Sequence, residues 1–351
     1  MEKKKNPYNI MFGKEPAQVI SRLPQLTEVI NSFQEDESNI YMITGVRGSG
    51  KTVFMTEVSK EFDAEEDWIT VELNSSANLL EDLLDSLVSD NYLAKIFQSA
   101  SINLSLFGVG LEVSNSVPIS SRQVALEKML KSIKKQNKKV LICIDEVTVT
   151  EQLKIFAGAF QIFMRKDLPV YLMMTGLFEN IDDMRNEKNL TFLYRAPRIE
   201  IRPLNLEVVA NNYRNNLGVD VKDSNYLANL TKGYSYAFQL LGYFTWKNAG
   251  DYKEAIPIVK QYLEENVYEK IWMEISSTDK RLLYGISKSE SSKAKEIKAI
   301  AELSDDAYSV YRGRLIKKRL VDGSEHGYLK FTLPLFNEFV IRKYMQDRMP
   351  V

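Results

Sequence analysis

The chain has 351 residues, 44% of them hydrophobic and 26% charged, and its formal net charge is -1. This length is enough for two or three domains with real cores, and the composition predicts a soluble globular protein. The near-neutral charge does not indicate a nucleic-acid partner, so DNA binding requires a local basic patch.

The chain has one cysteine, Cys143, and one histidine, His326. A lone cysteine excludes an intramolecular disulfide and disfavours a thiolate zinc site, which is typical of a reducing compartment. A Ser/His or Cys/His catalytic pair is not a serious candidate either. Residues 1–5 are charged with no apolar core behind them, and no run of about 18 apolar residues exists for a membrane span. We therefore expect a cytoplasmic protein with no membrane partner.

The first part of the chain leads to a phosphate-binding pattern. An irregular arm at residues 6–16 and a helix at residues 26–33 precede a β-rich run at residues 39–44. The next residues fit G-x-x-x-x-G-K-[ST] without a mismatch, and Val53 opens a stretch with helical spacing. The matching residues are Gly45-Val46-Arg47-Gly48-Ser49-Gly50-Lys51-Thr52. Strand, loop and helix follow one another in the order that a nucleotide loop requires.

Each residue type in this loop has a chemical reason. Gly45, Gly48 and Gly50 let main-chain N–H groups wrap a triphosphate closely. Lys51 is expected to reach the β and γ phosphates, and the Thr52 hydroxyl to ligate Mg²⁺. The helix that opens at Gly50 points its positive end at the phosphates. We therefore expect residues 45–53 to bind ATP.

The middle of the chain continues an α/β pattern. We expect a strand at residues 68–73, one amphipathic helix from Leu79 to about Phe97, and a helix at residues 121–135. Between these helices, residues 102–113 alternate apolar and polar side chains around a glycine turn. This predicts a β-hairpin inserted at about 101–115, which is either a self-packed flap or a surface for a partner.

The second chemical signal is Asp145-Glu146, which directly follows the apolar run Val140–Ile144. Such a run suits a central parallel strand, and ligands of open α/β sheets bind at the carboxyl ends of the strands. Two carboxylates are costly there without a cation or a water to act on. We expect Asp145 to hold Mg²⁺, usually through water, and Glu146 to orient and deprotonate the attacking water.

A helix is expected at residues 149–165, and a further buried strand, residues 170–176, ends at a hydroxyl residue, Thr175. Thr175 either senses the γ-phosphate and helps to place the water, or is a plain threonine at a strand end. A short strand at residues 198–201 is expected to complete the sheet.

The remaining chain is mainly helical. Residues 204–275 read as a small helical lid, with helices expected at residues 206–217, 226–231, 235–247 and 252–275. Residues 276–351 read as a winged helix-turn-helix domain, with helices expected at 279–286, 293–303 and 305–319 and a hairpin of residues 320–321 and 328–332.

This last part carries 15 lysines and arginines against 10 aspartates and glutamates, so it is net positive. Five basic residues gather at its third helix, as a surface that contacts DNA phosphates would require: Arg312, Arg314, Lys317, Lys318 and Arg319. Asp305 and Asp306 at the start of the same helix argue against base contact. Double-stranded DNA is therefore one candidate partner, and a protein-binding wing is the alternative.

In this order, the phosphate loop, Asp145-Glu146, Thr175, a helical lid and a winged helix resemble the AAA+ and STAND-like ATPases. The closest likeness is to the prokaryotic "archaeal-type" ATPases related to the origin-recognition initiators. It covers nearly the whole chain, from Asn6-Pro7-Tyr8 and Phe12-Gly13 to Tyr311-Arg312-Gly313-Arg314-Leu315. This likeness implies that the nucleotide base is adenine rather than guanine. The sequence contains no guanine-reading motif such as Asn-Lys-x-Asp.

The resemblance implies an α/β fold of the P-loop NTPase type: a parallel-sheet core at residues 1–203, a lid at 204–275 and a winged helix at 276–351. By likeness to the family's arginine-bearing segment, Arg195, or less strongly Arg198, would be an arginine finger that acts on a neighbouring subunit's nucleotide. The alternative for Arg195 is a surface salt bridge. A nucleotide-dependent homo-oligomer is left open.

The chain departs from the family at one place. These ATPases often carry Gly-x-Pro, sometimes with arginine, where the lid meets the nucleotide, but here the stretch is Gly233-Tyr234-Ser235-Tyr236. Hydrolysis is therefore expected to be slow or partner-dependent. The sequence predicts a Mg·ATP-dependent switch ATPase whose nucleotide state is coupled to a DNA-linked winged helix. The alternative is a signalling or scaffold ATPase that binds proteins through the winged helix and hairpin.

Overall fold

The computed structural model describes residues 5–11, 16–100 and 119–348. The chain divides into two compact units. The sheet unit consists of Ser21–Thr44 and Lys51–Glu200, and the helical unit consists of Met1–Ile20, Gly45–Gly50 and Ile201–Val351. The phosphate loop thus clusters with the helical unit, whereas the helix that follows it belongs to the sheet unit.

The sheet unit is built on five parallel strands in the order β2-β3-β4-β1-β5. Their bounds are β1 Ile40–Thr44, β2 Trp68–Leu73, β3 Lys139–Ile144, β4 Val170–Gly176 and β5 Arg198–Glu200. The central strands are buried on both faces, which explains their continuous apolar runs. The expected α/β parallel-sheet fold is therefore confirmed.

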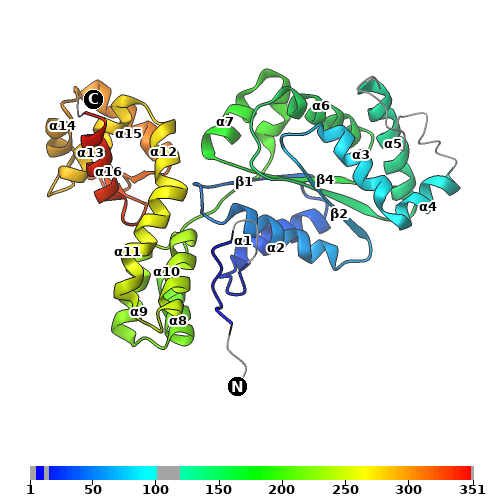
Figure 1. Cartoon of the computed structure of the whole chain (residues 1–351). Coiled ribbons are helices and arrows are strands. Elements are labelled where there is room, and N and C mark those ends of the chain that lie inside the picture. The colour runs from blue at the N-terminus through cyan, green and yellow to red at the C-terminus, as the bar shows by residue number, and fades with distance from the viewer. Residues whose placement is uncertain (1–4, 12–15, 101–118, 349–351) are drawn as a thin grey trace. The chain divides into compact units, whose positions relative to one another are not determined.

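Helices cover both faces of this sheet. Figure 1 shows α1 and α2 on one face and α3, α6 and α7 on the other. The bounds are α1 Leu23–Gln34, α2 Lys51–Asp63, α3 Leu79–Ser89, α4 Asn91–Ser99, α5 Ile119–Lys135, α6 Glu151–Arg165, α7 Phe178–Asn186 and the 3₁₀ segment η2 Lys188–Arg195. Cys143 lies in the core, where burial raises the pKa of its thiol to about 12, so it remains a protonated packing residue.

The helices of the sheet unit differ in part from the sequence prediction. The single helix expected from Leu79 to Phe97 is wrong, because Asp90 breaks it: its carboxylate accepts the N–H groups of Tyr92 and Leu93 at 2.8 and 2.9 Å and begins α4. Helix α7 and segment η2 were not expected. The inserted hairpin predicted at about 101–115 lies outside the described residues.

The first part of the helical unit is a bundle whose helices share one apolar core. The bounds are α8 Leu206–Leu217, α9 Val221–Thr231, α10 Ser235–Lys247, α11 Tyr252–Leu263, the π-helical segment η3 Glu264–Tyr268 and α12 Glu269–Glu274. Helices α11, η3 and α12 run on without a break, in place of the one long helix expected at residues 252–275. Tyr8 of the N-terminal arm is also part of this core and packs against Gly242 of α10.

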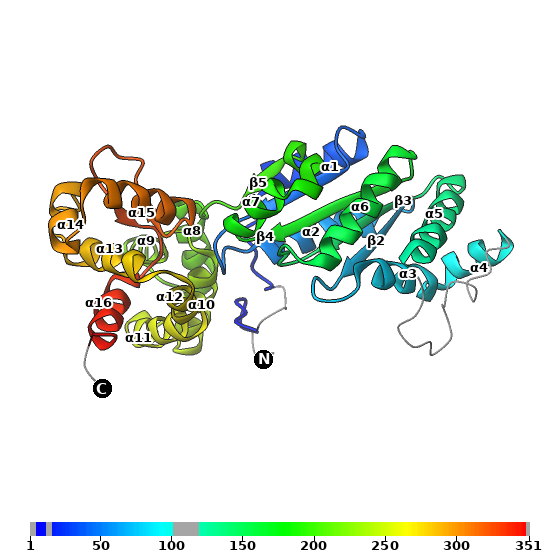
Figure 2. The same ribbon diagram turned by 90° about the horizontal axis from the view of Figure 1, so that it is seen from above.

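The second part of the helical unit consists of three helices, then a small hairpin, and then a fourth helix. The bounds are α13 Ser277–Lys288, α14 Ala294–Ala301, α15 Asp305–Lys317, β6 Val321–Asp322, β7 Lys330–Phe331 and α16 Phe336–Gln346. The two strands pair antiparallel, with Val321 opposite Phe331. Figure 2 shows α14 and α15 beside α13. Helix α16 was not expected from the sequence.

Helix α16 joins the two parts of the helical unit. The Tyr268 ring of η3 packs on Phe336 and Phe339 with centroid distances of 4.8 and 5.6 Å, and its hydroxyl donates to the Pro334 carbonyl. Arg342 and Lys343 of α16 form ion pairs with Glu264 and Glu269, both at 2.6 Å. Exposed ion pairs contribute little. The shared apolar core therefore provides most of the attachment.

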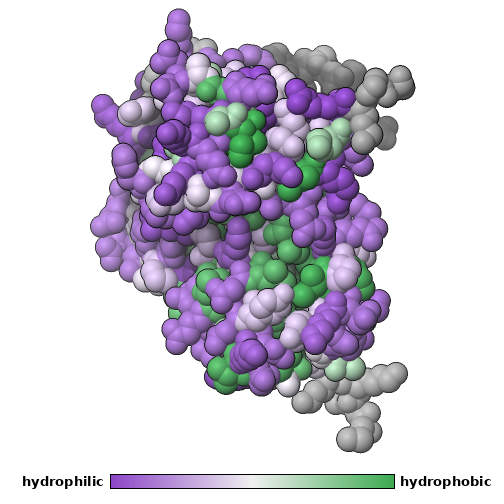
Figure 3. Space-filling model, turned by 90° about the vertical axis from the view of Figure 1, so that its left-hand side faces the viewer, coloured by the Kyte–Doolittle hydropathy of each residue, from purple (hydrophilic) through white to green (hydrophobic). Residues whose placement is uncertain are grey.

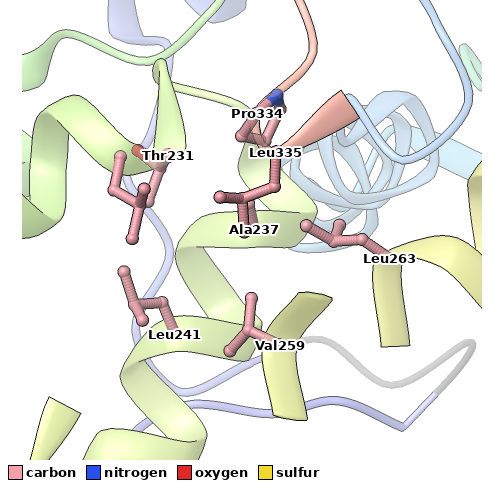
Figure 4. Close-up of a pocket in the computed structure, with 8 residues that line it drawn as sticks. Thr231, Ala237, Leu241, Val259, Leu263, Pro334 and Leu335 are labelled. Atoms are coloured by element: carbon pink, nitrogen blue, oxygen red, sulfur yellow. The ribbon is translucent and has the colours of Figure 1, made fainter. Parts of the chain in front are cut away.

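A small hollow lies at this junction and is shown in Figure 4. It has a volume of about 10 Å³, which is room for about one water. Its lining is apolar, so it is a packing gap rather than a ligand site. The lining residues are Leu230, Thr231, Ala237, Leu241, Val259, Leu263, Pro334 and Leu335.

The face seen in Figure 3 is mainly hydrophilic, with apolar side chains gathered in a few groups. Scattered exposed apolar residues are normal on a globular protein. None of the helices in the part of the chain that the structure describes is both long and apolar enough to cross a membrane.

Glu296 organises the turn that precedes α14. Its carboxylate accepts a hydrogen bond from the Ser289 hydroxyl at 2.8 Å, from the N–H groups of Glu290 and Ser291 at 3.0 and 3.1 Å, and from the Ser291 hydroxyl. These bonds, the Ser291 hydroxyl first, lower the pKa of Glu296 from 4.5 to about 2. A carboxyl whose pKa is lower in the folded state stabilises the protein above its unfolded pKa, and this contribution is lost as pH falls.

We therefore expect Glu296→Gln to lower the melting temperature at neutral pH. The difference from the unmodified protein should shrink as pH falls from 4.5 towards 2, because over that range the carboxyl is protonated in the unfolded state while it stays largely ionised in the folded state. Thermal unfolding followed by circular dichroism at several pH values measures this. Glu302→Gln, at the exposed end of α14, is the control. A difference that stays constant with pH would contradict the assignment.

Candidate active site

Parallel pairing brings three strand ends to the same edge of the sheet. Thr44 at the end of β1 is paired with Gly176 of β4, and Ile144 at the end of β3 is paired with Met174 of β4. Asp145 directly follows Ile144, and Thr175 lies between Met174 and Gly176. The sheet therefore places the two predicted polar residues at the carboxyl edge, where α/β folds bind ligands.

The carboxylate of Asp145 is the centre of this edge. Its Oδ2 accepts a hydrogen bond from the Thr52 hydroxyl of α2 at 2.7 Å, and its Oδ1 accepts one from the Thr175 hydroxyl. Thr52 and Asp145 lie 93 residues apart in the sequence. The predicted magnesium ligands are thus in direct contact.

Glu146 has an unusual backbone. Its φ is 52°, in the left-handed region that costs a non-glycine residue about 1 kcal/mol or more. Its N–H group donates to Asp145 Oδ1 at 3.0 Å and to the Thr175 hydroxyl at 3.2 Å, which holds this conformation. The Val147 N–H group adds a bond to the Thr175 carbonyl at 2.8 Å. The turn keeps the Glu146 side chain exposed at the sheet edge.

Thr175 is fully buried, and its hydroxyl lies between the two acidic residues. It donates to Asp145 and accepts from the main chain of Glu146. Contact of Thr175 with a γ-phosphate stays a prediction. What the hydroxyl does in the structure is to fix the positions of Asp145 and Glu146 relative to each other.

The phosphate loop has the backbone that its glycines predict. Gly48 and Gly50 have φ values of 72° and 93°. The Ser49 N–H group closes a turn on the Val46 carbonyl at 3.2 Å. Lys51 begins α2 and is only 7% exposed.

The two arginines considered as arginine fingers are in different environments. Arg198 of β5 forms an ion pair with Asp182 of α7 at 2.9 Å. Arg195 is exposed at the end of η2. Of the two, Arg195 is therefore better placed to reach another molecule, and its role stays a prediction.

The basic residues predicted near α15 make contacts of their own. Arg312 donates to the Gly323 carbonyl of the hairpin at 2.8 Å, and Arg314 pairs with Asp279 of α13 at 3.1 Å. Asp279 is fully buried and forms a capping box with Ser276. The basic cluster predicted from the sequence is thus partly structural. The other three members are Lys317, Lys318 and Arg319.

Sequence reasoning missed the residues that contact the phosphate loop from the start of α10. They are Tyr234, Ser235 and Tyr236. The sequence carried one signal, which was that this stretch lacks the family's proline and arginine. That absence did not indicate that other side chains of the stretch contact the phosphate loop.

A five-stranded parallel sheet, a glycine phosphate loop after β1 and acidic residues after β3 together define the class of P-loop nucleotide-binding proteins. Residues 20–192 match the family described as an ATPase domain predominantly from Archaea. A second family, described as a domain of unknown function, matches residues 265–340, from η3 into α16. No curated protein matches the chain.

Solved structures with the same fold include the ORC2 protein of Aeropyrum pernix. In its ADPNP-ADP complexes it has a TM-score of 0.60 and 12% sequence identity, over 97% of this chain and 98% of that chain. Its ADP form has a TM-score of 0.51 and 13% identity, with the same coverage. The Cdc6p of Pyrobaculum aerophilum has 14% identity and a TM-score of 0.49, again over 97% and 98% of the two chains. The two ORC2 matches confirm the expected AAA+ fold, and the family match over residues 20–192 confirms the expected ATPase class.

We expect Thr175→Val to reduce ATP turnover by about ten- to a hundredfold. The valine keeps the shape but leaves Asp145 Oδ1 and the Glu146 N–H group each without one bond, and a bond to a charged group contributes about 1.5–3 kcal/mol. Steady-state phosphate release measures the effect. Thr245→Val, at a fully buried threonine of α10, is the matched control. Equal turnover in both variants would show that the Thr175 hydroxyl does not position the acidic pair.

Proposed function

We propose that this chain is a Mg·ATP-dependent switch ATPase. The observation that carries the proposal is the chain of hydrogen bonds Thr52–Asp145–Thr175 within an ATPase domain. Thr52 lies in α2, Asp145 follows β3 and Thr175 lies in β4. The three side chains meet where the ligands of parallel sheets bind.

The donors at this edge fit magnesium. Mg²⁺ prefers oxygen ligands and keeps several waters, and it commonly binds through a carboxylate and substrate phosphates. The Thr52 hydroxyl and the Asp145 carboxylate supply oxygen donors that are already 2.7 Å apart. When bound with ATP, the ion would neutralise charge on the β and γ phosphates.

The other roles follow from the chain's own residues. Gly45–Gly50 would wrap the phosphates with main-chain N–H groups, and Lys51 would neutralise the β and γ oxygens. Glu146, exposed on its left-handed turn, would orient the attacking water and accept its proton. Arg195 would act on the nucleotide of a second copy in a nucleotide-dependent assembly.

The output of the switch is proposed to lie in the C-terminal part. We assign residues 1–203 to the ATPase core, 204–275 to a lid and 276–351 to a winged helix. Three helices and a two-stranded hairpin support the last assignment. The net positive charge of this part supports double-stranded DNA as the partner.

A second candidate output is a protein partner. Helix α15 begins with Asp305 and Asp306, and its Val310 is 61% exposed. Arg312 and Arg314 are engaged within the unit. An acidic helix start and internally paired basic residues favour a protein surface over a phosphate backbone.

We expect Lys51→Ala to abolish ATP turnover and Glu146→Gln to reduce it at least a hundredfold while ATP still binds. The reason is that Lys51 holds the phosphates, whereas Glu146 acts on the water. Phosphate release and nucleotide binding are measured with and without mixed-sequence duplex DNA. Turnover unchanged by Glu146→Gln would remove this residue from the base role.

DNA binding is tested at Lys317, an exposed residue in the last turn of α15. If the basic end of α15 contacts phosphate, Lys317→Ala should weaken duplex binding and reduce the slope of log affinity against log salt by about one. Lys222→Ala, at an exposed lysine of α9, is the control. No affinity for DNA at low salt in the unmodified protein would favour the protein partner.

A further inference from the structure

The start of α10 contacts three successive main-chain carbonyls of the phosphate loop. The Tyr234 hydroxyl donates to the Arg47 carbonyl at 2.6 Å, the Tyr236 N–H group to Gly48 at 3.1 Å, and the Ser235 hydroxyl to Ser49 at 2.8 Å. All of these residues belong to the helical unit. The loop is therefore fixed from its carbonyl side, at each residue between Val46 and Gly50.

These contacts satisfy groups that a helix start leaves open. Helix α10 has no side-chain cap at its N-cap residue, Tyr234. The N–H groups of a first helical turn have no partner within the helix. The Gly48 carbonyl takes one of them, that of Tyr236, so the loop itself caps the helix.

The same geometry directs the N–H groups of the loop. In a trans peptide the carbonyl of one residue and the N–H group of the next point in opposite directions, and the described chain has no cis peptide. With the carbonyls of Arg47 and Ser49 facing α10, the N–H groups of Gly48 and Gly50 point to the other side. That side is the one with which a loop of this pattern binds phosphate oxygens.

The environment of Tyr234 favours its hydrogen bond to the Arg47 carbonyl. It is only 5% exposed, and burial raises the pKa of its phenol, so the hydroxyl remains a donor at physiological pH. Its oxygen lies so close to Gly48 that a Cβ there would come within 2.2 Å. Gly48 is therefore required by the tyrosine as well as by its φ of 72°.

The loop has two further attachments in the same unit. Arg47 forms an ion pair with Glu274 of α12 at 3.7 Å, and Val46 packs against the apolar core of the bundle. No arginine stands in the segment 233–238 to meet the nucleotide itself. The start of α10 acts instead on the loop that would hold it.

We propose that Tyr234, Ser235 and Tyr236 are positioning residues that hold the phosphate loop in its phosphate-binding conformation and so couple nucleotide binding to the helical unit. This inference rests on the proposed function of the loop. Because coupling free energies are reciprocal, a nucleotide that favours this loop conformation also stabilises the contact with α10. The three contacts thus replace the missing arginine as the means by which the lid responds to nucleotide.

The test is binding of Mg·ADP to the full-length protein by isothermal titration calorimetry. Tyr234→Phe and Ser235→Ala each remove one donor to a loop carbonyl, and each should weaken binding about tenfold, the double variant about a hundredfold. The turnover number at saturating ATP should stay within about twofold of the unmodified protein, because neither side chain touches the reacting phosphate. A loss of turnover number with unchanged affinity would contradict a positioning role.

Tyr213→Phe is the matched control. Tyr213 is also fully buried in the helical unit, and its hydroxyl donates to a main-chain carbonyl, that of Phe238, at 2.8 Å. Both tyrosine variants should lower the melting temperature by similar amounts, but only Tyr234→Phe should weaken Mg·ADP binding. Equal affinities in all three proteins, or an equal loss in both variants, would overturn the inference. If the unmodified protein binds no better than Lys51→Ala, the nucleotide function itself fails, and the inference fails with it.

Discussion

The carboxylate of Asp145 is the constraint on which the active edge depends. It connects a helix that follows the phosphate loop to two strand ends through the Thr52 and Thr175 hydroxyls. A carboxylate at the edge of a buried sheet is tolerated because donors reach both of its oxygens. The arrangement also fixes the neighbouring Glu146, since the same hydroxyl that donates to Asp145 accepts the Glu146 N–H group. One buried threonine thus sets the positions of Asp145, the predicted metal ligand, and Glu146, the predicted base, relative to each other.

The phosphate loop is constrained from another direction. Its carbonyls are bonded to the start of α10, and its own glycines permit the left-handed backbone that this requires. The two halves of the nucleotide motif are therefore stabilised by different parts of the chain. The residues up to Gly50 cluster with the helical unit, and the residues from Lys51 onward cluster with the sheet unit.

The sequence predicts most of the sheet unit because its signals are local. Continuous apolar runs located the central strands, and the glycine pattern located the loop to the residue. The contact between Thr52 and Asp145 could be expected from the motif, whereas the position of Thr175 depends on the register of β3 with β4, which no local pattern encodes. The break at Asp90 was missed because the helical spacing of apolar residues continues across it. In the structure, the Asp90 side chain caps a new helix there instead.

The helical unit was harder to predict because its key contacts join residues far apart in the sequence. Arg314 looks like a surface charge until the fold places it against buried Asp279. The contact of Tyr234 with the Arg47 carbonyl spans 187 residues, and a tyrosine in an apolar helix start gives no sign of it. The domain boundaries at 203 and 275 stay predictions, and so do the roles of Arg195 and the other site residues.

Helix α16 has a consequence for how motion travels. Because its rings and those of η3 belong to one core, the bundle and the hairpin part are packed against each other through α16. We therefore expect a rotation of α10 to move the hairpin part together with the bundle, since both belong to this core. Such coupled movement would depend on the whole shared core rather than on any single contact.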